Sequence, residues 1–109
     1  SMSKSEFILC AANYYNDGST DNINVINITE GYVVCGRRHH NCIHINSKIL
    51  GFPYSEEALK IVRTEEQGFI TNTNRFVTRL EALTIARAAN QIITGEGNPR
   101  LGLFSEDLY

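Results

Sequence analysis

The sequence predicts an α+β fold: an antiparallel β-sheet packed with two main α-helices in a single domain. Short runs of β-branched and aromatic residues bounded by turn residues fill the first third of the chain. From Cys42 the spacing of apolar residues changes to a helical one. Thr78 and Glu81 form a T-x-x-E capping box, which is typical of a helix start. Strands and helices that occupy separate parts of a chain favour the α+β class.

Three strands are expected in the first third. The apolar run Glu6–Tyr14 predicts the first, and the turn residues Asn16–Gly18 begin an exposed loop after it. Ile23–Ile28 and Tyr32–Cys35 are rich in β-branched residues and predict two further strands that form a hairpin.

A first helix follows these strands. Cys42, Ile45 and Ile49 form an apolar helical stripe, which Gly51 and Pro53 end in the order typical of a helix C-terminus. A further helical turn or two is predicted over 55–62.

The second half of the chain returns to strands and then forms the other main helix. Gln67–Thr71 and Arg75–Val77 predict two strands around a polar turn. The capping box then opens a helix over Thr78–Ile93, and Leu101–Tyr109 could supply an edge strand and a tail. The helix residues expected to face the core are Leu80, Leu83, Ala86, Ala89 and Ile93.

Composition restricts the possible classes of function. The 109 residues predict one ligand-binding domain over 6–109, with residues 1–5 as a tag scar and disordered N-terminus. A net charge of −2 argues against binding to nucleic acid polymers, and no apolar run is long enough to span a bilayer. Three cysteines favour a reducing cytoplasm over a disulfide framework.

The stretch VVCGRRHHNCIHI, from Val33 to Ile45, gathers arginine, histidine and cysteine residues. A zinc site usually has two separated pairs of ligands, and this pattern is absent from Cys35, His39, His40 and Cys42. The arginines between these residues would also repel a cation. A cysteine nucleophile with a histidine base is a second alternative. In the simplest alternative, both cysteines are apolar core residues. We expect no metal, no cofactor and no catalytic residue.

Anion binding accounts for more of this stretch. Gly36 follows a predicted strand and precedes a predicted helix, where free backbone N–H groups gather. Arg37 and Arg38 add forked guanidinium donors that match phosphate oxygens, and His39 lies beside them.

The second main helix offers a similar site. Arg79 stands at its first position, against the helix dipole, and Arg75 and Phe76 precede it. Two such sites suit a ligand with two phosphates and a base that stacks on an aromatic ring. The alternative is that these arginines pair with surface carboxylates and that Phe76 belongs to the core. The residues predicted to bind the ligand are Arg37, Arg38, His39, Arg75, Phe76, Arg79, Phe69, Asn13 and Tyr14.

Three segments, CGRRHHNC, QGFITNTNRFVTRLEALTIARAANQI and LFSEDLY, resemble small proteins encoded by phages and prophages. The characterised family that they resemble is the first family of Thoeris anti-defence proteins. This resemblance implies a nucleotide sponge for immune evasion, which sequesters glyco-cyclic ADP-ribose made by bacterial TIR-domain proteins without degrading it. It also implies a homodimer or higher homo-oligomer with pockets at the interface, in the cytoplasm of the infected host. Carried over to this sequence, the diphosphate and adenine contacts fall on Arg37, Arg38, Arg75, Phe76 and Arg79.

Two other functions stay open from the sequence. A small phosphodiesterase would use His39 or His40 as general acid and base to cleave a cyclic nucleotide. A phage inhibitor of a host protein would cover its target with the arginine face.

Overall fold

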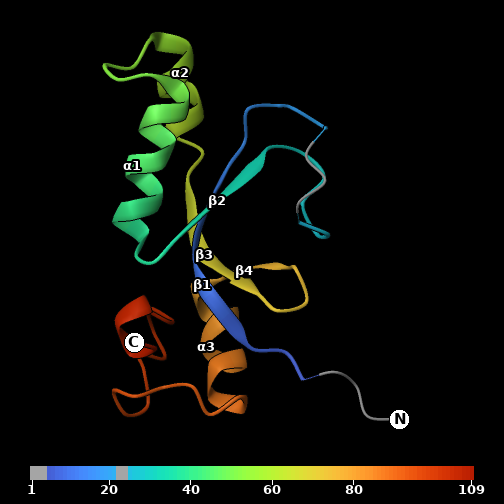
Figure 1. The fold of residues 1–109 in the computed structure, drawn as a ribbon, viewed down its shortest axis with the longest axis vertical. Coiled ribbons are helices and arrows are strands. Elements are labelled where there is room, and N and C mark those ends of the chain that lie inside the picture. Colours follow the sequence, from blue (N-terminus) through green and yellow to red (C-terminus); the bar gives the residue numbers. More distant parts are fainter. Residues whose placement is uncertain (1–4, 22–24) are drawn as a thin grey trace.

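Four antiparallel strands form one sheet in the order β2-β1-β3-β4 (Figure 1). They are β1 (Ile8–Tyr15), β2 (Tyr32–Gly36), β3 (Glu66–Thr71) and β4 (Phe76–Thr78). The helices are α1 (His39–Leu50), α2 (Glu56–Val62), α3 (Arg79–Ala88) and the short 3₁₀ helix η1 (Ser105–Asp107). The structure is a computed structural model and describes residues 5–21 and 25–109. This arrangement confirms the predicted α+β class.

The main core lies between the sheet and the two longer helices. It contains Ala11 and Phe69 from the sheet, Cys42 from α1, and Leu83 from α3, all of them buried. Both helices therefore cover the same face of the sheet. Burying these apolar side chains is the main source of stability for the domain.

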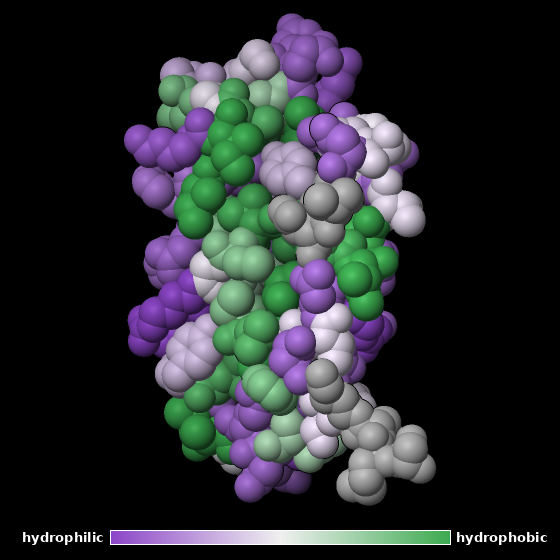
Figure 2. All heavy atoms as spheres, turned by 45° about the vertical axis from the view of Figure 1, so that its right-hand side comes forward, coloured by the Kyte–Doolittle hydropathy of each residue, from purple (hydrophilic) through white to green (hydrophobic). Residues whose placement is uncertain are grey.

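The opposite face of the sheet carries a smaller apolar cluster. Ala12, Ile70 and Phe76 from the strands pack there against Val25 and the partly buried Ile28, from the segment before β2. Figure 2 shows apolar side chains in a band along the long axis of the molecule, with hydrophilic side chains on both sides of it.

The predicted strand over Ile23–Ile28 is wrong for its described part, and residues 23 and 24 lie outside the described residues. Residues 25–28 form a turn, and β2 pairs with β1 instead. This segment does not form a strand because the Asn27 side chain bonds Phe76 instead. Its amide accepts a hydrogen bond from Phe76 N at 2.9 Å and donates one to Phe76 O at 2.7 Å. This side-chain amide takes the place of a neighbouring strand at the edge of β4.

The first helix begins earlier than predicted, and of the predicted stripe only Cys42 is buried. Its buried residues are His39, Cys42 and Asn46, whereas Ile45 and Ile49 are 42% and 59% exposed. Asn46 can be buried because its side-chain oxygen accepts a hydrogen bond from the Tyr32 hydroxyl. The short helix predicted over 55–62 is confirmed as α2.

The second main helix ends five residues before the predicted end. Asn90 has a positive φ of 57°, and Gln91 N donates to Ala86 O, which stops the helical pattern. The Gln91 amide then pairs with the backbone N and O of Ile8. Leu83 and Ala86 are buried as predicted and Ala89 is partly buried, but Leu80 and Ile93 are exposed.

The last residues pack onto the domain instead of forming an edge strand. Asn98 and Gly102 make an isolated bridge, Leu103 is fully buried, and η1 follows. At the other end, residues 1–4 of the predicted disordered N-terminus lie outside the described residues. Ser5 is held there, because its carbonyl accepts a hydrogen bond from Asn72. Among the helices of the described residues, none combines the length and apolar character needed to cross a membrane.

Candidate functional site

The N-terminus of α1 is formed by the turn that follows β2. Arg38 is extended, with φ −127° and ψ 160°, and its N–H donates to the Asn41 side-chain oxygen at 3.0 Å. The helix then begins at His39. This geometry places Arg37 and Arg38 at the start of α1, as the sequence predicts.

The N-terminus of α3 has the predicted capping box. The Thr78 hydroxyl accepts a hydrogen bond from Glu81 N at 3.2 Å, and the Glu81 carboxylate accepts one from Thr78 N at 2.8 Å. Arg79 is the first residue of the helix, and its guanidinium is half-buried.

The segment 103–109 joins these two helix starts. Arg79 Nη1 donates to Leu103 O at 2.8 Å, and Leu103 N donates back to Arg79 O at 2.8 Å. Arg38 Nη1 donates to Ser105 Oγ at 3.0 Å, and its Nη2 donates to Tyr109 O at 2.7 Å. In Figure 1 this segment lies below the first turn of α1 and beside α3.

Two aromatic rings of the same segment lie against guanidinium groups. Phe104 lies 4.5 Å from the guanidinium of Arg79, and the Tyr109 ring lies 5.2 Å from Arg38 and 5.8 Å from Arg37. Contacts of this kind are favourable because the face of an aromatic ring is electronegative. We call Arg37, Arg38 and Arg79, with these two rings, the arginine cluster.

Local electrostatics reflect this packing. Burial lowers the pKa of Arg79, which the charge of Glu106 partly offsets. A backbone hydrogen bond lowers the pKa of Glu106, and the nearby charge of Arg38 adds to the effect. Burial raises the pKa of the Tyr109 hydroxyl, which donates to Arg37 O at 3.0 Å. The arginine cluster thus carries three guanidinium groups, and the exposed Glu106 carboxylate lies near it.

His39 lies beneath the arginine cluster and is buried. Its Nε2 is 2.8 Å from Gly68 O, and its ring meets Phe69 edge-on with centroids 5.1 Å apart. Burial lowers the pKa of His39, so the neutral ring is favoured. Phe69 is fully buried in the core. Both residues therefore support the cluster from inside the domain.

A chain of hydrogen bonds connects Asn13 to Arg79 through three elements. Asn13 donates to the Tyr15 hydroxyl at 3.2 Å, which donates to Glu65 Oε1. Gln67 donates to the other oxygen of Glu65 at 3.0 Å and accepts from Arg79 Nη2 at 2.7 Å. Asn13 is fully buried, and its side-chain oxygen has no partner among the described residues.

The other predicted ligand residues lie elsewhere. Arg75, in the turn between β3 and β4, makes a bidentate ion pair with Glu6, both contacts being 2.9 Å. Phe76 is buried in the smaller cluster, with its ring 6.1 Å from that of Tyr14. The Tyr14 hydroxyl donates to Glu30 O at 2.6 Å. The structure thus brings Arg37, Arg38 and Arg79 together and does not bring Arg75, Phe76 or Tyr14 to them.

Sequence reasoning missed the contribution of residues 103–109. The two aromatic residues in FSEDLY were a signal, because arginines upstream could use them as stacking partners. It also missed Glu65 and Gln67, whose polar side chains carry no motif.

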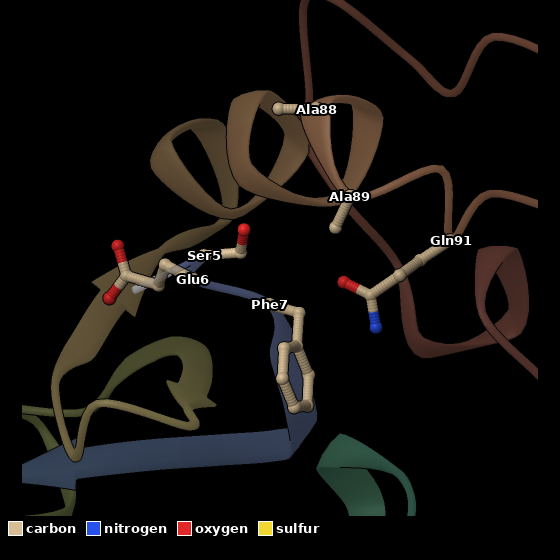
Figure 3. Close-up of a pocket in the computed structure, with 6 residues that line it drawn as sticks. All are labelled: Ser5, Glu6, Phe7, Ala88, Ala89 and Gln91. Atoms are coloured by element: carbon tan, nitrogen blue, oxygen red, sulfur yellow. The ribbon is translucent and has the colours of Figure 1, made fainter. Parts of the chain in front are cut away.

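The surface of the domain has several hollows, and one of about 450 Å³ is lined by Phe104 of the arginine cluster and by Glu106. Figure 3 shows one of about 510 Å³ between the residues before β1 and the end of α3, where the Gln91 amide points toward Phe7. Another, of about 640 Å³, runs along α1 beside His40, His44 and Phe52. Among the residues described, no three His, Cys, Asp or Glu side chains gather closely enough to hold a metal ion.

Comparison with known proteins gives one family. The family described as Phage T4 y16D protein matches residues 7–109, which is nearly the whole chain and includes the arginine cluster. No curated protein and no solved structure matches the chain. Because the family covers β1 through the last residue, the fold and the cluster both belong to the matched region. The chain is therefore a member of the phage T4 y16D protein family.

Proposed function

We propose that this phage protein is a sponge for a small nucleotide signal, which it binds and sequesters without chemical change. The ligand class is a cyclic ADP-ribose-type molecule made by bacterial TIR-domain proteins, as the resemblance to Thoeris anti-defence proteins implies. Sequestration in the host cytoplasm would block Thoeris immunity. The observation that supports the proposal most is the arginine cluster.

No Asp or Glu side chain of the described residues forms an ion pair with an arginine of the cluster. Within the described residues, ion pairs join Lys60 to Glu57 and Arg75 to Glu6, and neither includes an arginine of the cluster. Arg79 donates to the neutral oxygen atoms of Gln67 and Leu103, and Arg38 Nη1 donates to the neutral hydroxyl of Ser105. A guanidinium group with neutral partners still attracts a phosphate, and each has five N–H donors. Arg75 is a weaker candidate because Glu6 already holds it.

Arg37 is the most available of the three guanidinium groups. It is exposed, and its guanidinium donates no hydrogen bond to any described residue. Tyr109 and Phe104 are 40% and 36% exposed, so each ring keeps an accessible part besides its contact with arginine. Such rings can stack on a nucleobase while the guanidinium groups bind phosphates.

The environment of His39 favours binding over cleavage. A general acid and base must exchange protons with a ligand, whereas His39 is buried and bonded to Gly68 O. Its lowered pKa also disfavours the protonated form. These features argue against His39 as the general acid and base, which leaves the exposed His40 as the histidine of the phosphodiesterase alternative.

Exposed apolar side chains support self-association. Ile43, Ile45 and Ile49 of α1 and Phe52 after it are between 40% and 74% exposed. Exposed apolar patches of this kind mark interfaces between proteins. We therefore include a homodimer or higher homo-oligomer in the proposal, with ligand pockets at the interface.

The same apolar side chains also favour the second candidate, an inhibitor of a host protein. The two functions differ in their target, because a sponge removes the nucleotide signal whereas an inhibitor blocks a host protein. A boiled, protein-free extract of cells with an active TIR-domain protein keeps the signal but no host target. If the protein abolishes the power of this extract to activate the downstream effector, the sponge is supported. If the extract keeps its full activity, the sponge is excluded.

The fate of the ligand separates a sponge from an enzyme. The protein is incubated with glyco-cyclic ADP-ribose, washed, and heated to unfold it, and the released nucleotide is analysed by chromatography. A sponge returns the intact ligand at the amount that was bound. Recovery of a linear product would instead indicate the phosphodiesterase.

A further inference from the structure

Two cysteines lie on neighbouring strands, on the sheet face opposite α1 and α3. Ala12 of β1 pairs with Cys35 of β2, and Cys10 precedes Ala12 by two residues. Because side chains two residues apart in a strand share a face, Cys10 and Cys35 are diagonal neighbours on one face. The β1–β3 register shifts between Ile8 and Cys10, an irregularity that can redirect a side chain.

The two thiols are neighbours on this face of the sheet and can be reached from solvent. Cys35 is exposed and Cys10 is partly exposed. The thiol of Cys35 donates a hydrogen bond to the sulfur of Cys10, which lowers the pKa of Cys10 to about 7 against the opposing effect of burial. The same hydrogen bond, with burial, raises the pKa of Cys35. A substantial fraction of Cys10 is therefore thiolate at neutral pH, and the thiolate is the reactive form.

The third cysteine provides an internal contrast. Cys42 is fully buried, and its sulfur lies 3.7 Å from Ala11 O and 3.5 Å from Arg38 O. Burial raises the pKa of Cys42 to about 11. This thiol therefore stays protonated and shielded.

We propose that Cys10 and Cys35 are an oxidisable pair, which a peroxide converts into a disulfide between β1 and β2. Cys10 is the residue that reacts first, and Cys35 is the one that resolves the intermediate. The proposal does not depend on the proposed function.

The reaction balances with hydrogen peroxide as the oxidant. The Cys10 thiolate attacks one peroxide oxygen, so that an S–O bond forms, the O–O bond breaks, and hydroxide leaves as water after taking a proton. The Cys35 sulfur then attacks Cys10, forming the S–S bond and breaking the S–O bond, and its proton leaves with the oxygen as a second water. Two thiols lose two electrons and one peroxide is reduced.

The position of β2 suits this closure. Diagonal neighbours on paired strands are about 7–8 Å apart, whereas the Cα atoms of a disulfide lie within about 6.8 Å, so β2 must move toward β1 at Cys35 for the bond to form. In the sheet of the described residues, β2 has a partner only on its β1 side. Its end beside Cys35 can therefore shift without breaking a second ladder.

The test counts free thiols after oxidation. The protein is treated with hydrogen peroxide, unfolded, alkylated and weighed intact by mass spectrometry, and its peptides are mapped. We expect the number of cysteines that can be alkylated to fall from three in the untreated protein to one in the oxidised protein. The oxidised protein before alkylation should be about 2 Da lighter than the reduced protein, and peptide mapping should find a disulfide between Cys10 and Cys35. Cys42→Ala should behave in the same way, with two alkylated cysteines falling to none.

The single variants separate the two roles. Cys35→Ser should stop at the sulfenic acid, which dimedone labels at Cys10, and Cys10→Ser should keep both remaining thiols free. Thermal melts of each variant confirm that it is folded. The proposal is overturned if Cys10 of the wild-type protein can still be alkylated after peroxide treatment. It is also overturned if the disulfide joins Cys42 or a second chain.

Discussion

The arginine residues of this protein differ in what they contact, and this difference decides their roles. Arg75 is held by a carboxylate, whereas Arg79 is held by the neutral oxygen atoms of Leu103 and Gln67. The sequence could predict that arginines stand at helix starts, because capping residues and periodicity mark those positions. It could not predict which ones a carboxylate neutralises, since Glu6 lies far from Arg75 along the chain.

The pair of Glu6 and Arg75 predicts a pH dependence of stability. Its hydrogen bonds to Arg75 and Thr73 lower the pKa of Glu6 to about 2, below the value of about 4.3 in unfolded chains. The lowered pKa contributes stability that is complete above the unfolded value and is lost as the pH falls toward 2. Glu6→Gln should therefore lower the free energy of unfolding by about 1 kcal/mol at neutral pH, a value reduced because solvent screens this partly exposed pair. Near pH 2 the same substitution should leave the free energy of unfolding unchanged. Urea denaturation at several pH values measures this difference.

Glu57→Gln is the matched control for this prediction. Glu57 faces Lys60 at 3.8 Å, but both side chains are more than two-thirds exposed. This variant should change stability little at any pH. Equal effects of the two substitutions would contradict the assignment of Glu6 as a stabilising partner.

Gly102 connects residues 103–109 to the start of α3. Its φ is +90°, and an added Cβ would lie 2.4 Å from the carbonyl carbon of Arg79. Gly102→Ala should cost about 1–3 kcal/mol of stability, because both strain and a clash would displace the segment. Gly95 also has a positive φ, but no atom lies within 4 Å of a Cβ added there, so Gly95→Ala should cost less stability. Thermal unfolding of both variants checks the order, and a larger loss for Gly95→Ala would contradict this view of the segment.

At the scale of elements, sequence patterns located most helices and strands but not their partners. The capping box fixed the start of α3, and turn residues fixed the ends of β1 and α1. Two of the errors, the strand over 23–28 and the late end of the second main helix, have one physical source. The side-chain amides of Asn27 and Gln91 pair with backbone groups of Phe76 and Ile8 and so replace regular backbone pairing. No local periodicity reports such long-range contacts.

The burial of α1 shows the same limit. Apolar periodicity favoured Ile45 and Ile49 as core residues, but the structure buries Asn46, which Tyr32 satisfies by a hydrogen bond. The isoleucines are thereby left on the surface. Periodicity detects a helix, but only the tertiary contacts decide which face is buried.

The capping box of α3 predicts a measurable contribution to stability. Thr78→Ala removes the acceptor for Glu81 N and should lower the free energy of unfolding by about 1 kcal/mol. Thr84→Ala, an exposed threonine inside the same helix, should change stability by less than about 0.5 kcal/mol. Chemical denaturation of both variants is the measurement, and similar losses for the two would exclude capping as the cause.

At the scale of the whole molecule, the exposed apolar residues of α1 and the arginine cluster are two features that the fold leaves open to partners. If copies associate through α1, Ile45→Glu should shift the mass measured by light scattering toward the monomer. Ile26→Glu is the control, because Ile26 is also exposed but lies outside α1. An unchanged mass for Ile45→Glu, with the wild type oligomeric, would place the interface elsewhere.

The most direct test of the proposed sponge is the dissociation constant of glyco-cyclic ADP-ribose for Arg37→Gln, measured by isothermal titration calorimetry. One lost charge-assisted contact costs about 1.5–3 kcal/mol, so binding should weaken by about tenfold to a hundredfold. Arg63 is the C-cap residue of α2, and Figure 1 shows α2 at the opposite end of α1 from the C-terminal segment, so Arg63→Gln should bind like the wild type. Wild-type affinity in Arg37→Gln, or no binding by the wild type itself, would contradict the account.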